Sequence, residues 1–292
     1  DCFAVAACCA PARVGTMKPA PFDYIAPESV EEALAVLAEA GEDARILAGG
    51  QTLSPMLNMR LVEPAVLIDI SRLPALNYIR RKNGHIEIGA AATQNELENW
   101  PELAAQAPLL AQALPHIGHF QTRNRGTVCG SLAFADPSAE LPLCLALLGG
   151  EVVLQSASRQ RVVKAADFQL GMLSTAREAD EIISAARFPV AEAGAGYGFA
   201  EMALRHGDFA LAAIAVKAGK TGVRIAIGGV ADRPMVRNFP AGIEGAALDD
   251  ALNDLAWDLA AADDPHATAR YRRELVRRLG RKTVEEAKSC RV

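Results

Sequence analysis

Residues 123–143 (RNRGTVCGSLAFADPSAELPL) constrain the fold of this chain more than any other stretch. Small residues gather there in a turn, and Asp136 and Pro137 then precede an apolar run over 141–148. Because Asp is a favoured N-cap and proline fits the first helical position, the pattern predicts a glycine turn, a loop and a buried helix capped by Asp136. Backbone amides in such a turn approach anions closely, which predicts a phosphate-bearing ligand.

A second glycine turn lies earlier in the chain. Residues 44–48 predict a short buried strand, Gly49 and Gly50 break it, and Ser54 with Pro55 repeats the signal for a helix start. Alone, two glycines after a strand most often form a plain turn, and neither GxGxxG nor GxxxxGKS is present. Two such turns in one chain favour a ligand that carries two phosphates or is long enough to span both loops.

Composition narrows the classes of function. The chain has 292 residues, 51% of them hydrophobic and 22% charged, which is typical of a globular protein long enough for two domains. Its net charge of −5 offers no basic face for nucleic acid. The run 141–148 is far shorter than the roughly 20 apolar residues that span a bilayer. We therefore expect neither a nucleic-acid partner nor a membrane span.

The cysteines indicate neither a metal site nor a disulfide framework. They are Cys2, Cys8, Cys9, Cys129, Cys144 and Cys290. Neither a CxxC pair nor a zinc-type spacing occurs, so we expect no metal site, and a reducing cytoplasm is the simplest location. Residues 1–16 lack the basic and apolar regions of a secretory signal, and we interpret them as an N-terminal extension for which disorder is one explanation.

Helical and strand patterns mix along the rest of the chain, which predicts an α+β fold without strict βαβ alternation. The expected helices are one capped by Ser29 and stopped by Gly41, one capped by Thr93, and those over 101–114, 246–261 and 267–288. The expected strands cover 66–70, 85–90, 151–155, 161–164, 181–188, 209–217 and 223–228. Pro189 and the glycine-rich run 191–198 predict a domain boundary.

Isolated polar side chains near these turns have two interpretations each. His116 and Arg123 could contact a ligand, but lone histidines are usually structural and exposed loop arginines are usually solvated. The polar group at 205–208 is typical of a surface turn, and the arginines over 270–278 are typical of one solvated helix face. The spacing supports neither a Ser-His-Asp nor a Cys-His set, so we name no catalytic residue.

Five segments together resemble a known family. They are AGGQTLSPMLNMRL (48–61), RNRGTVCGSLAFADPSAELP (123–142), DEIISAARFP (180–189), HGDFALAAIAV (206–216) and RIAIGGVADRP (224–234). In this order and spacing the sequence is similar to the FAD-binding medium subunits of molybdenum hydroxylases, the carbon monoxide dehydrogenase and xanthine dehydrogenase family. Each motif is weak alone, but five in register are specific. The resemblance runs from about Met17 to the C-terminus.

The resemblance implies an α+β architecture in two domains. Residues 17–192 would form a two-lobed FAD-binding domain of the vanillyl-alcohol-oxidase (PCMH) type, with lobes over about 17–75 and 76–192. Residues 193–292 would form a smaller α+β domain of the carbon monoxide dehydrogenase flavoprotein C-terminal type. Residues 1–16 would precede both as the extension.

The resemblance also implies a set of FAD contacts. The FAD pyrophosphate would lie across the two glycine turns, Ile117 would line the flavin site, Glu140 would accept a hydrogen bond from the adenosine portion, and Ile183 would approach the isoalloxazine. An aromatic residue is expected near Phe199. The implied cofactor-binding residues are Leu47, Ala48, Gly49, Gly50, Gln51, Thr52, Leu53, Ser54, Ile117, Thr127, Val128, Cys129, Gly130, Ser131, Glu140, Ile183 and Phe199.

The sequence departs from the family pattern at four of these positions or beside them. Cys129 replaces a glycine of the TxGGN or TxGGD turn, so residue 129 must avoid positive φ or tolerate strain. Ser131 replaces a longer polar side chain, and Ala200 stands where some relatives carry lysine. Glu140 stands where many relatives have Asp, which should keep the acceptor role.

The implied function is electron transfer within a complex. A large subunit would hydroxylate substrate at a molybdopterin cofactor, a small subunit would carry [2Fe–2S] clusters, and this subunit would collect the electrons on FAD. It would pass them to NAD, a quinone or a cytochrome, in an assembly of the form (αβγ)2. One alternative is a self-contained FAD-dependent oxidase or dehydrogenase. The other is a non-catalytic scaffold subunit that binds a nucleotide only structurally.

Overall fold

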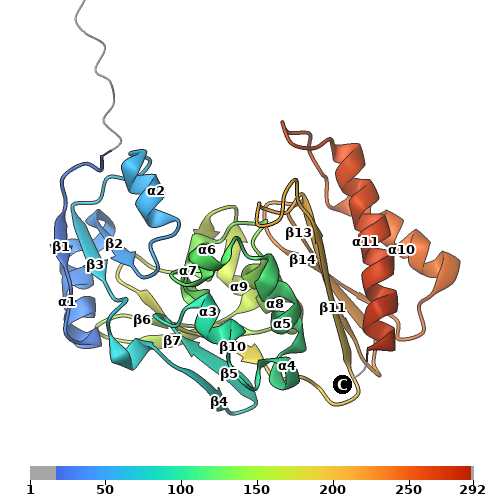
Figure 1. The fold of residues 1–292 in the computed structure, drawn as a ribbon, viewed down its shortest axis with the longest axis horizontal. Helices are drawn as coiled ribbons and strands as arrows, with labels where there is room; N and C mark the ends of the chain where they lie inside the picture. The colour runs from blue at the N-terminus through green and yellow to red at the C-terminus, as the bar shows by residue number, and fades with distance from the viewer. Residues whose placement is uncertain (1–17, 291–292) are drawn as a thin grey trace, which may run out of the picture.

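The computed structural model describes residues 18–290; the expected N-terminal extension, with Cys2, Cys8 and Cys9, lies outside the described residues. Three main sheets follow one another along this part of the chain (Figure 1). A three-stranded and a five-stranded sheet come first, and a four-stranded sheet covered by two long helices comes last. This arrangement confirms the predicted α+β class.

The first sheet consists of three short parallel strands, in the order β1 (Asp23–Ile25), β3 (Val66–Asp69) and β2 (Ala44–Leu47). Parallel strands need crossover connections, and these contain α1 (Val30–Ala40) and α2 (Leu53–Asn58). Ser29 Oγ accepts a hydrogen bond from the Glu32 N–H at 3.1 Å, and Gly41 ends α1 with a φ of 54°. Both predicted boundaries of this helix are therefore confirmed.

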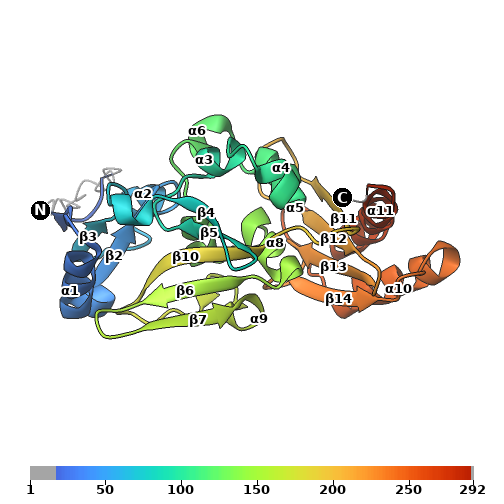
Figure 2. The same cartoon turned by 90° about the horizontal axis from the view of Figure 1, so that it is seen from below.

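The second sheet is antiparallel, in the order β4 (Ile79–Lys82), β5 (His85–Gly89), β10 (Ile182–Pro189), β6 (Glu151–Gln155) and β7 (Gln160–Lys164) (Figure 2). Short helices connect its strands: α3 (Gln94–Glu98), α4 (Leu103–Gln106), α5 (Pro108–Ala113), α6 (Phe120–Arg123), α7 (Val128–Phe134), α8 (Glu140–Leu148) and α9 (Ala165–Phe168). A small ribbon of β8 (Gln169–Gly171) and β9 (Ser174–Thr175) follows α9. The strands predicted here are confirmed to within one residue at each end.

The helix predicted over 101–114 is instead two helices, α4 and α5, followed by the single turn Leu114–His116. Ala107 separates them with a φ of −143° and a ψ of 65°. Ala107 precedes Pro108, and the proline ring sterically disfavours helical backbone at the residue before it. The break therefore has a local cause, the proline at position 108, which the spacing of apolar residues does not reveal.

The helix start predicted at Asp136 is wrong. The buried helix α8 begins at Glu140, and Asp136 Oδ1 instead accepts a hydrogen bond from the Ser138 N–H at 2.8 Å, which closes a turn. An unpredicted helix, α7, occupies 128–134, and Thr127 caps it by accepting from the Gly130 N–H at 3.0 Å. The predicted glycine turn is thus the first turn of a helix.

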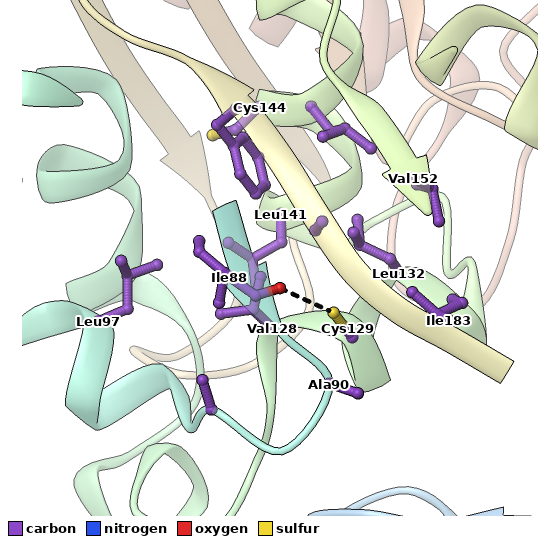
Figure 3. Packing of buried hydrophobic residues seen from close by; sticks show 14 of the residues in the cluster. Ile88, Ala90, Leu97, Val128, Cys129, Leu132, Leu141, Cys144, Val152 and Ile183 are labelled. Carbon is purple, nitrogen blue, oxygen red and sulfur yellow. Dashed lines mark hydrogen bonds between the residues drawn. The ribbon is translucent and has the colours of Figure 1, made fainter. Parts of the chain in front are cut away.

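The main core lies between the second sheet and the helices α7 and α8. Ile88 of β5, Leu132 of α7 and Leu141 of α8 are each at most 1% exposed and pack together there (Figure 3). Helix α8 is apolar nearly all round, since it is enclosed by the second sheet on one side and the third on the other. The core thus fixes the start of α7 and of α8 relative to the second sheet.

The third sheet is an antiparallel meander of β11 (Gly196–Met202), β12 (Ala212–Ala218), β13 (Val223–Gly228) and β14 (Met235–Phe239). The two predicted C-terminal helices, α10 (Gly245–Asp258) and α11 (Ala269–Ser289), are present and cover one face of this sheet (Figure 1). Side chains of β12 alternate between the two faces of this sheet. Ala213 and Ala215 join the main core, whereas Ile214 and Val216 join the core under α10 and α11.

The glycine-rich run 191–198 enters this sheet, because Gly196 and Gly198 begin β11. A Cβ at Gly196 would lie 1.7 Å from the Ala287 carbonyl oxygen, so glycine is required for α11 to approach the strand. Arg272 of α11 does not belong to a solvated face: it is 7% exposed and donates to the Leu211 carbonyl at 2.5 Å. No helix within residues 18–290 is both long and apolar enough to cross a membrane.

Candidate functional site

A cleft of about 540 Å³ lies between the first and second sheets and reaches a turn of the third. The predicted residues on its wall are Ala48, Gly49, Gly50, Gln51, Thr52, Leu53, Ile117, Thr127, Cys129, Gly130, Ser131, Glu140 and Ile183. Leu47, Ser54, Val128 and Phe199 do not line it. The fold therefore brings both glycine turns, separated by more than seventy residues, to one cavity.

The four other predicted residues lie just behind this wall. Leu47 ends β2, and Ser54 lies in the first turn of α2, where its N–H donates to the Gly50 carbonyl at 3.0 Å. Val128 is fully buried in the main core. Phe199 lies on β11, with its ring centroid 5.2 Å from that of His116. They support the wall rather than form it.

The two glycine turns touch through their backbones. A Cβ at Gly49 would lie 2.1 Å from the Arg125 carbonyl oxygen and 2.8 Å from Gly126 Cα, distances that real Cβ atoms do not adopt. Gly50 has a φ of +70°, in the left-handed region. The Gly126 carbonyl in turn accepts from the Gln94 N–H at 2.8 Å. These contacts hold the two stretches of backbone together on the wall of the same cavity.

Cys129 avoids positive φ because it lies inside α7, not at a tight turn. Its side chain is 3% exposed, and its thiol donates to the Ile88 carbonyl at 3.6 Å (Figure 3). Burial raises the pKa of the Cys129 thiol to about 12, so the thiol is neutral and unreactive. The departure from glycine therefore adds a core contact without backbone strain.

Two acids and a histidine meet where the cleft approaches the third sheet. Glu140, the first residue of α8, lines the cleft and is 7% exposed. Its burial, and next the charge of Glu201, raise its pKa to about 8. His116 Nδ1 lies 3.3 Å from Glu201 Oε1, and this contact raises the pKa of His116. This corner thus places two buried carboxylates beside one histidine, with Glu140 alone on the cleft wall.

Positive charge enters the cleft from arginines that the sequence patterns did not single out. Arg45 and Arg177 both line it, and Arg177 donates to the Glu178 and Glu181 carbonyls at 2.9 and 2.8 Å. Burial, and then the neighbouring charge of Arg45, lower the pKa of Arg177. No local motif marks either residue, because only the fold places 45 beside 177.

The turn at 205–208 has a larger role than the predicted surface turn. Arg205 is exposed and pairs with Asp208 at 2.9 Å, as such a turn would. However, Gly207, Asp208 and Phe209 line the cleft, and a Cβ at Gly207 would lie 2.9 Å from the Gly118 carbonyl oxygen. The third sheet therefore closes one side of the cavity.

Arg123 proves to be a structural residue and is not solvated. Its side chain is 12% exposed, it pairs with Glu98 Oε2 at 2.7 Å, and it donates to the Ile117 carbonyl at 3.0 Å. It thereby ties the loop that carries Ile117 to α3. Within residues 18–290, no group of three or more His, Cys, Asp or Glu side chains is placed to hold a metal ion.

Comparison with known proteins agrees with this geometry. Residues 20–191 match the family model described as the FAD binding domain in molybdopterin dehydrogenase, and residues 197–287 match the CO dehydrogenase flavoprotein C-terminal domain. The chain is 37% identical to the nicotine 6-hydroxylase medium subunit of Paenarthrobacter nicotinovorans, over 90% of this chain and 96% of that one. It is 35% identical to the carbon monoxide dehydrogenase medium chain of Afipia carboxidovorans, over 94% and 99%.

Solved structures show the same likeness. A chain of the Cu,Mo-CO dehydrogenase in its cyanide-inactivated form superposes with a TM-score of 0.88 at 33% identity, covering 93% of this chain and 99% of that one. A chain of quinoline 2-oxidoreductase from Pseudomonas putida 86 gives a TM-score of 0.88 at 32% identity, covering 93% and 98%.

Proposed function

This chain belongs to the family of FAD-binding medium subunits of molybdenum hydroxylases, and from this premise we propose that it holds FAD in the cleft and relays electrons within a larger complex. The single observation that best supports this role is the contact of the two glycine turns, where Gly49 lies against the Arg125 carbonyl on the wall of one cavity. Two adjacent glycine turns, at the starts of α2 and α7, suit a ligand with two phosphates.

The residues present fit FAD. Gly49 and Gly50 line the cleft without side chains, since a Cβ on them would meet the Arg125 carbonyl oxygen or Ser54 Oγ. Arg45 and Arg177 line the same cleft and supply positive charge for a pyrophosphate. The buried Gln94 Oε1 lines the same cavity and has no hydrogen-bond partner within the described protein, so a donor on a ligand would satisfy it. We assign the predicted cofactor-binding residues to this role, those on the wall by contact and those behind it by support.

The chain's own residues bind, orient and shield the cofactor. FAD, when bound, supplies the capacity to accept and release electrons singly or in pairs. Ile117 and Ile183 present apolar surface on the cleft wall and exclude water, while Arg177 offsets the negative charge of the phosphates. We assign no catalytic side chain.

We extend the proposal to the partners implied by the resemblance: a large molybdopterin-binding subunit, a small [2Fe–2S] subunit, an (αβγ)2 assembly, and NAD, a quinone or a cytochrome as acceptor. The names of the relatives support a subunit role, since two of them are a medium subunit and a medium chain. Cys129 and Cys144 are buried free thiols, which supports our proposal that the protein is located in the reducing cytoplasm. We propose that residues 17–192 form the two-lobed FAD-binding domain and that residues 193–292 form the C-terminal domain.

The visible spectrum and subunit composition of the protein purified from its native host test this function. We expect flavin bands together with iron–sulfur absorbance and two co-purifying chains. A yellow single chain that turns over a substrate alone would instead identify the protein as a self-contained flavoenzyme. A colourless chain that takes up no FAD on reconstitution would favour the scaffold role.

A further inference from the structure

The buried corner formed by Glu140, Glu201 and His116 has a composition that the proposed function does not explain. Glu140 begins α8, Glu201 lies on β11, and His116 ends the turn after α5, so three separate elements meet there. The side chains of Glu201 and His116 are 5% and 37% exposed, and Glu140 is 7% exposed. Only His116 therefore reaches solvent to a useful extent.

The corner contains more acids than bases. The titratable groups that face Glu140 are Glu201, His116, Asp136 in the loop before α8, and the Cys144 thiol one turn further along α8. Arg224 of β13 contacts the opposite end of α8, where it donates to the Ala146 carbonyl at 3.2 Å. One histidine thus faces two carboxylates that have lost most of their water, and two such carboxylates cannot both be ionised at low cost.

The contacts decide which carboxylate keeps its charge. His116 Nδ1 pairs with Glu201 Oε1 at 3.3 Å, while Glu201 Oε2 is buried without a partner within the described protein. A carboxylate paired with a histidine cation is the better place for the negative charge. The raised pKa of Glu140, about 8, and the raised pKa of His116 agree with that distribution. The proton accordingly resides on Glu140.

We infer that Glu140 is a neutral carboxylic acid that donates a hydrogen bond into the cleft, so that it selects a ligand atom which accepts one. The inference rests on FAD being the ligand, whose ring nitrogens, carbonyls and hydroxyl oxygens supply acceptors. It reverses the role implied by the family resemblance, in which Glu140 accepts a hydrogen bond from the adenosine portion. Glu201 acts as a positioning residue whose negative charge keeps the proton on Glu140, and His116 holds Glu201 in place through their contact.

Proton release on binding distinguishes the two roles. Apoprotein is titrated with FAD by calorimetry at pH 7 in two buffers of different ionisation enthalpy. A Glu140 that donates its proton in a hydrogen bond stays protonated and releases none, whereas a Glu140 that binds FAD as a carboxylate releases about one. Release of about one proton, abolished in Glu140→Gln, would overturn the inference.

The pH dependence of FAD affinity provides the second readout. We expect the wild-type dissociation constant to rise about tenfold per pH unit above pH 8, because only the protonated form offers the donor. Glu140→Gln keeps an N–H donor that does not titrate in this range, so its FAD affinity should lack this pH dependence. Glu201→Gln, which removes the nearby anion, should move the onset to lower pH. Affinity that improves with rising pH would contradict the inference.

Controls separate these effects from folding and from the proposed function. Glu285→Gln, which breaks an exposed pair with Arg281 on α11, should leave both readouts unchanged. Infrared spectroscopy of the apoprotein at pH 7 should show the carbonyl band of a protonated acid that Glu140→Gln lacks, and its absence would overturn the inference without any FAD. A wild-type protein that shows the band and binds no FAD would refute the proposed function alone and retain the neutral acid.

Discussion

Gly49 and the Arg125 carbonyl oxygen are so close that a Cβ on residue 49 would stand 2.1 Å from that oxygen. This contact holds the two glycine turns together on the cleft wall. It links a strand end of the first sheet to the loop before α7. The sequence of neither segment predicts that the other lies beside it. The contact is backbone against backbone, so no side-chain rotation can relieve a clash there.

Gly49→Ala should therefore separate the turns. We expect a loss of about 1–3 kcal/mol in the free energy of unfolding, as for other overpacked sites, and at least about a tenfold weaker FAD affinity. Denaturant unfolding and FAD titration measure the two effects. Gly242→Ala is the matched control, because a Cβ there meets nothing within 4 Å. Equal behaviour of the two variants would refute the structural role of the contact.

Thr127→Ala removes the cap of α7 on the cleft wall. The loss of the hydrogen bond from the Gly130 N–H should cost about 1 kcal/mol of stability and also weaken FAD binding. Ser29→Ala removes the equivalent cap of α1, outside the cleft, and should cost a similar amount of stability with FAD affinity unchanged. Parallel unfolding curves and FAD titrations check both; a Ser29 variant that binds FAD as weakly as the Thr127 variant would contradict this.

Arg177→Gln removes one of the cleft's positive charges. Since FAD carries its pyrophosphate as an anion, we expect affinity to fall by about tenfold or more and to depend less on salt concentration. Titrations at low and high salt measure both effects. Arg177→Lys should retain part of the affinity, and Arg237→Gln, whose partner Asp258 is remote and exposed, should change nothing. Unaltered binding by Arg177→Gln would show that the pyrophosphate lies elsewhere.

Glu140→Gln should stabilise the apoprotein above neutral pH. The pKa of Glu140 is raised to about 8 from an ordinary value of 4.5, so between these values the native state binds a proton that the unfolded chain has lost. Wild-type stability therefore falls as pH rises through this window, by up to roughly 1.4 kcal/mol per pH unit. The variant lacks that loss, so its advantage should grow from pH 5 to pH 8 and then level off. Urea unfolding at pH 5, 7 and 9 measures it; an advantage that is constant with pH would contradict the assignment.

The His116–Glu201 pair should also make the free energy of unfolding fall as pH rises, as Glu140 does, but by a smaller amount. The pKa of His116 is raised in the native state, so its stabilisation is complete below about pH 6.5 and is lost as pH rises through the native value. His116→Gln should be destabilised by no more than about 1 kcal/mol at pH 6, because the ring is partly exposed and screened by solvent. The difference in stability from wild type should vanish at high pH. Thermal unfolding across pH 6–9 measures it, and a difference that persists at pH 9 would contradict the prediction.

Local signals predicted most of the elements and failed at particular residues. Ser29 and Gly41 bound their helix as expected, because capping depends only on neighbouring backbone groups. Asp136 failed as a cap because the Ser138 N–H takes its carboxylate, and α7 was missed because its seven residues are too few for a periodic signal. Gly196 lies in the run that predicts a domain boundary, and the structure shows that it is also a strand residue crowded by α11.

The sequence alone determined many of the strands, the helices capped by Ser29 and Thr93, the two glycine-rich stretches and the family of this chain, since each depends on short patterns or on motifs in register. Only the tertiary structure decided that the turns touch at Gly49 and Arg125, that Arg45 joins Arg177 in one cavity, and that Glu201 faces Glu140. These pairs are distant in the chain, so their distances and burial are set by the tertiary packing, in which the second and third sheets enclose α7 and α8. Charge and hydrogen-bond direction in the cleft follow from that burial and not from residue type.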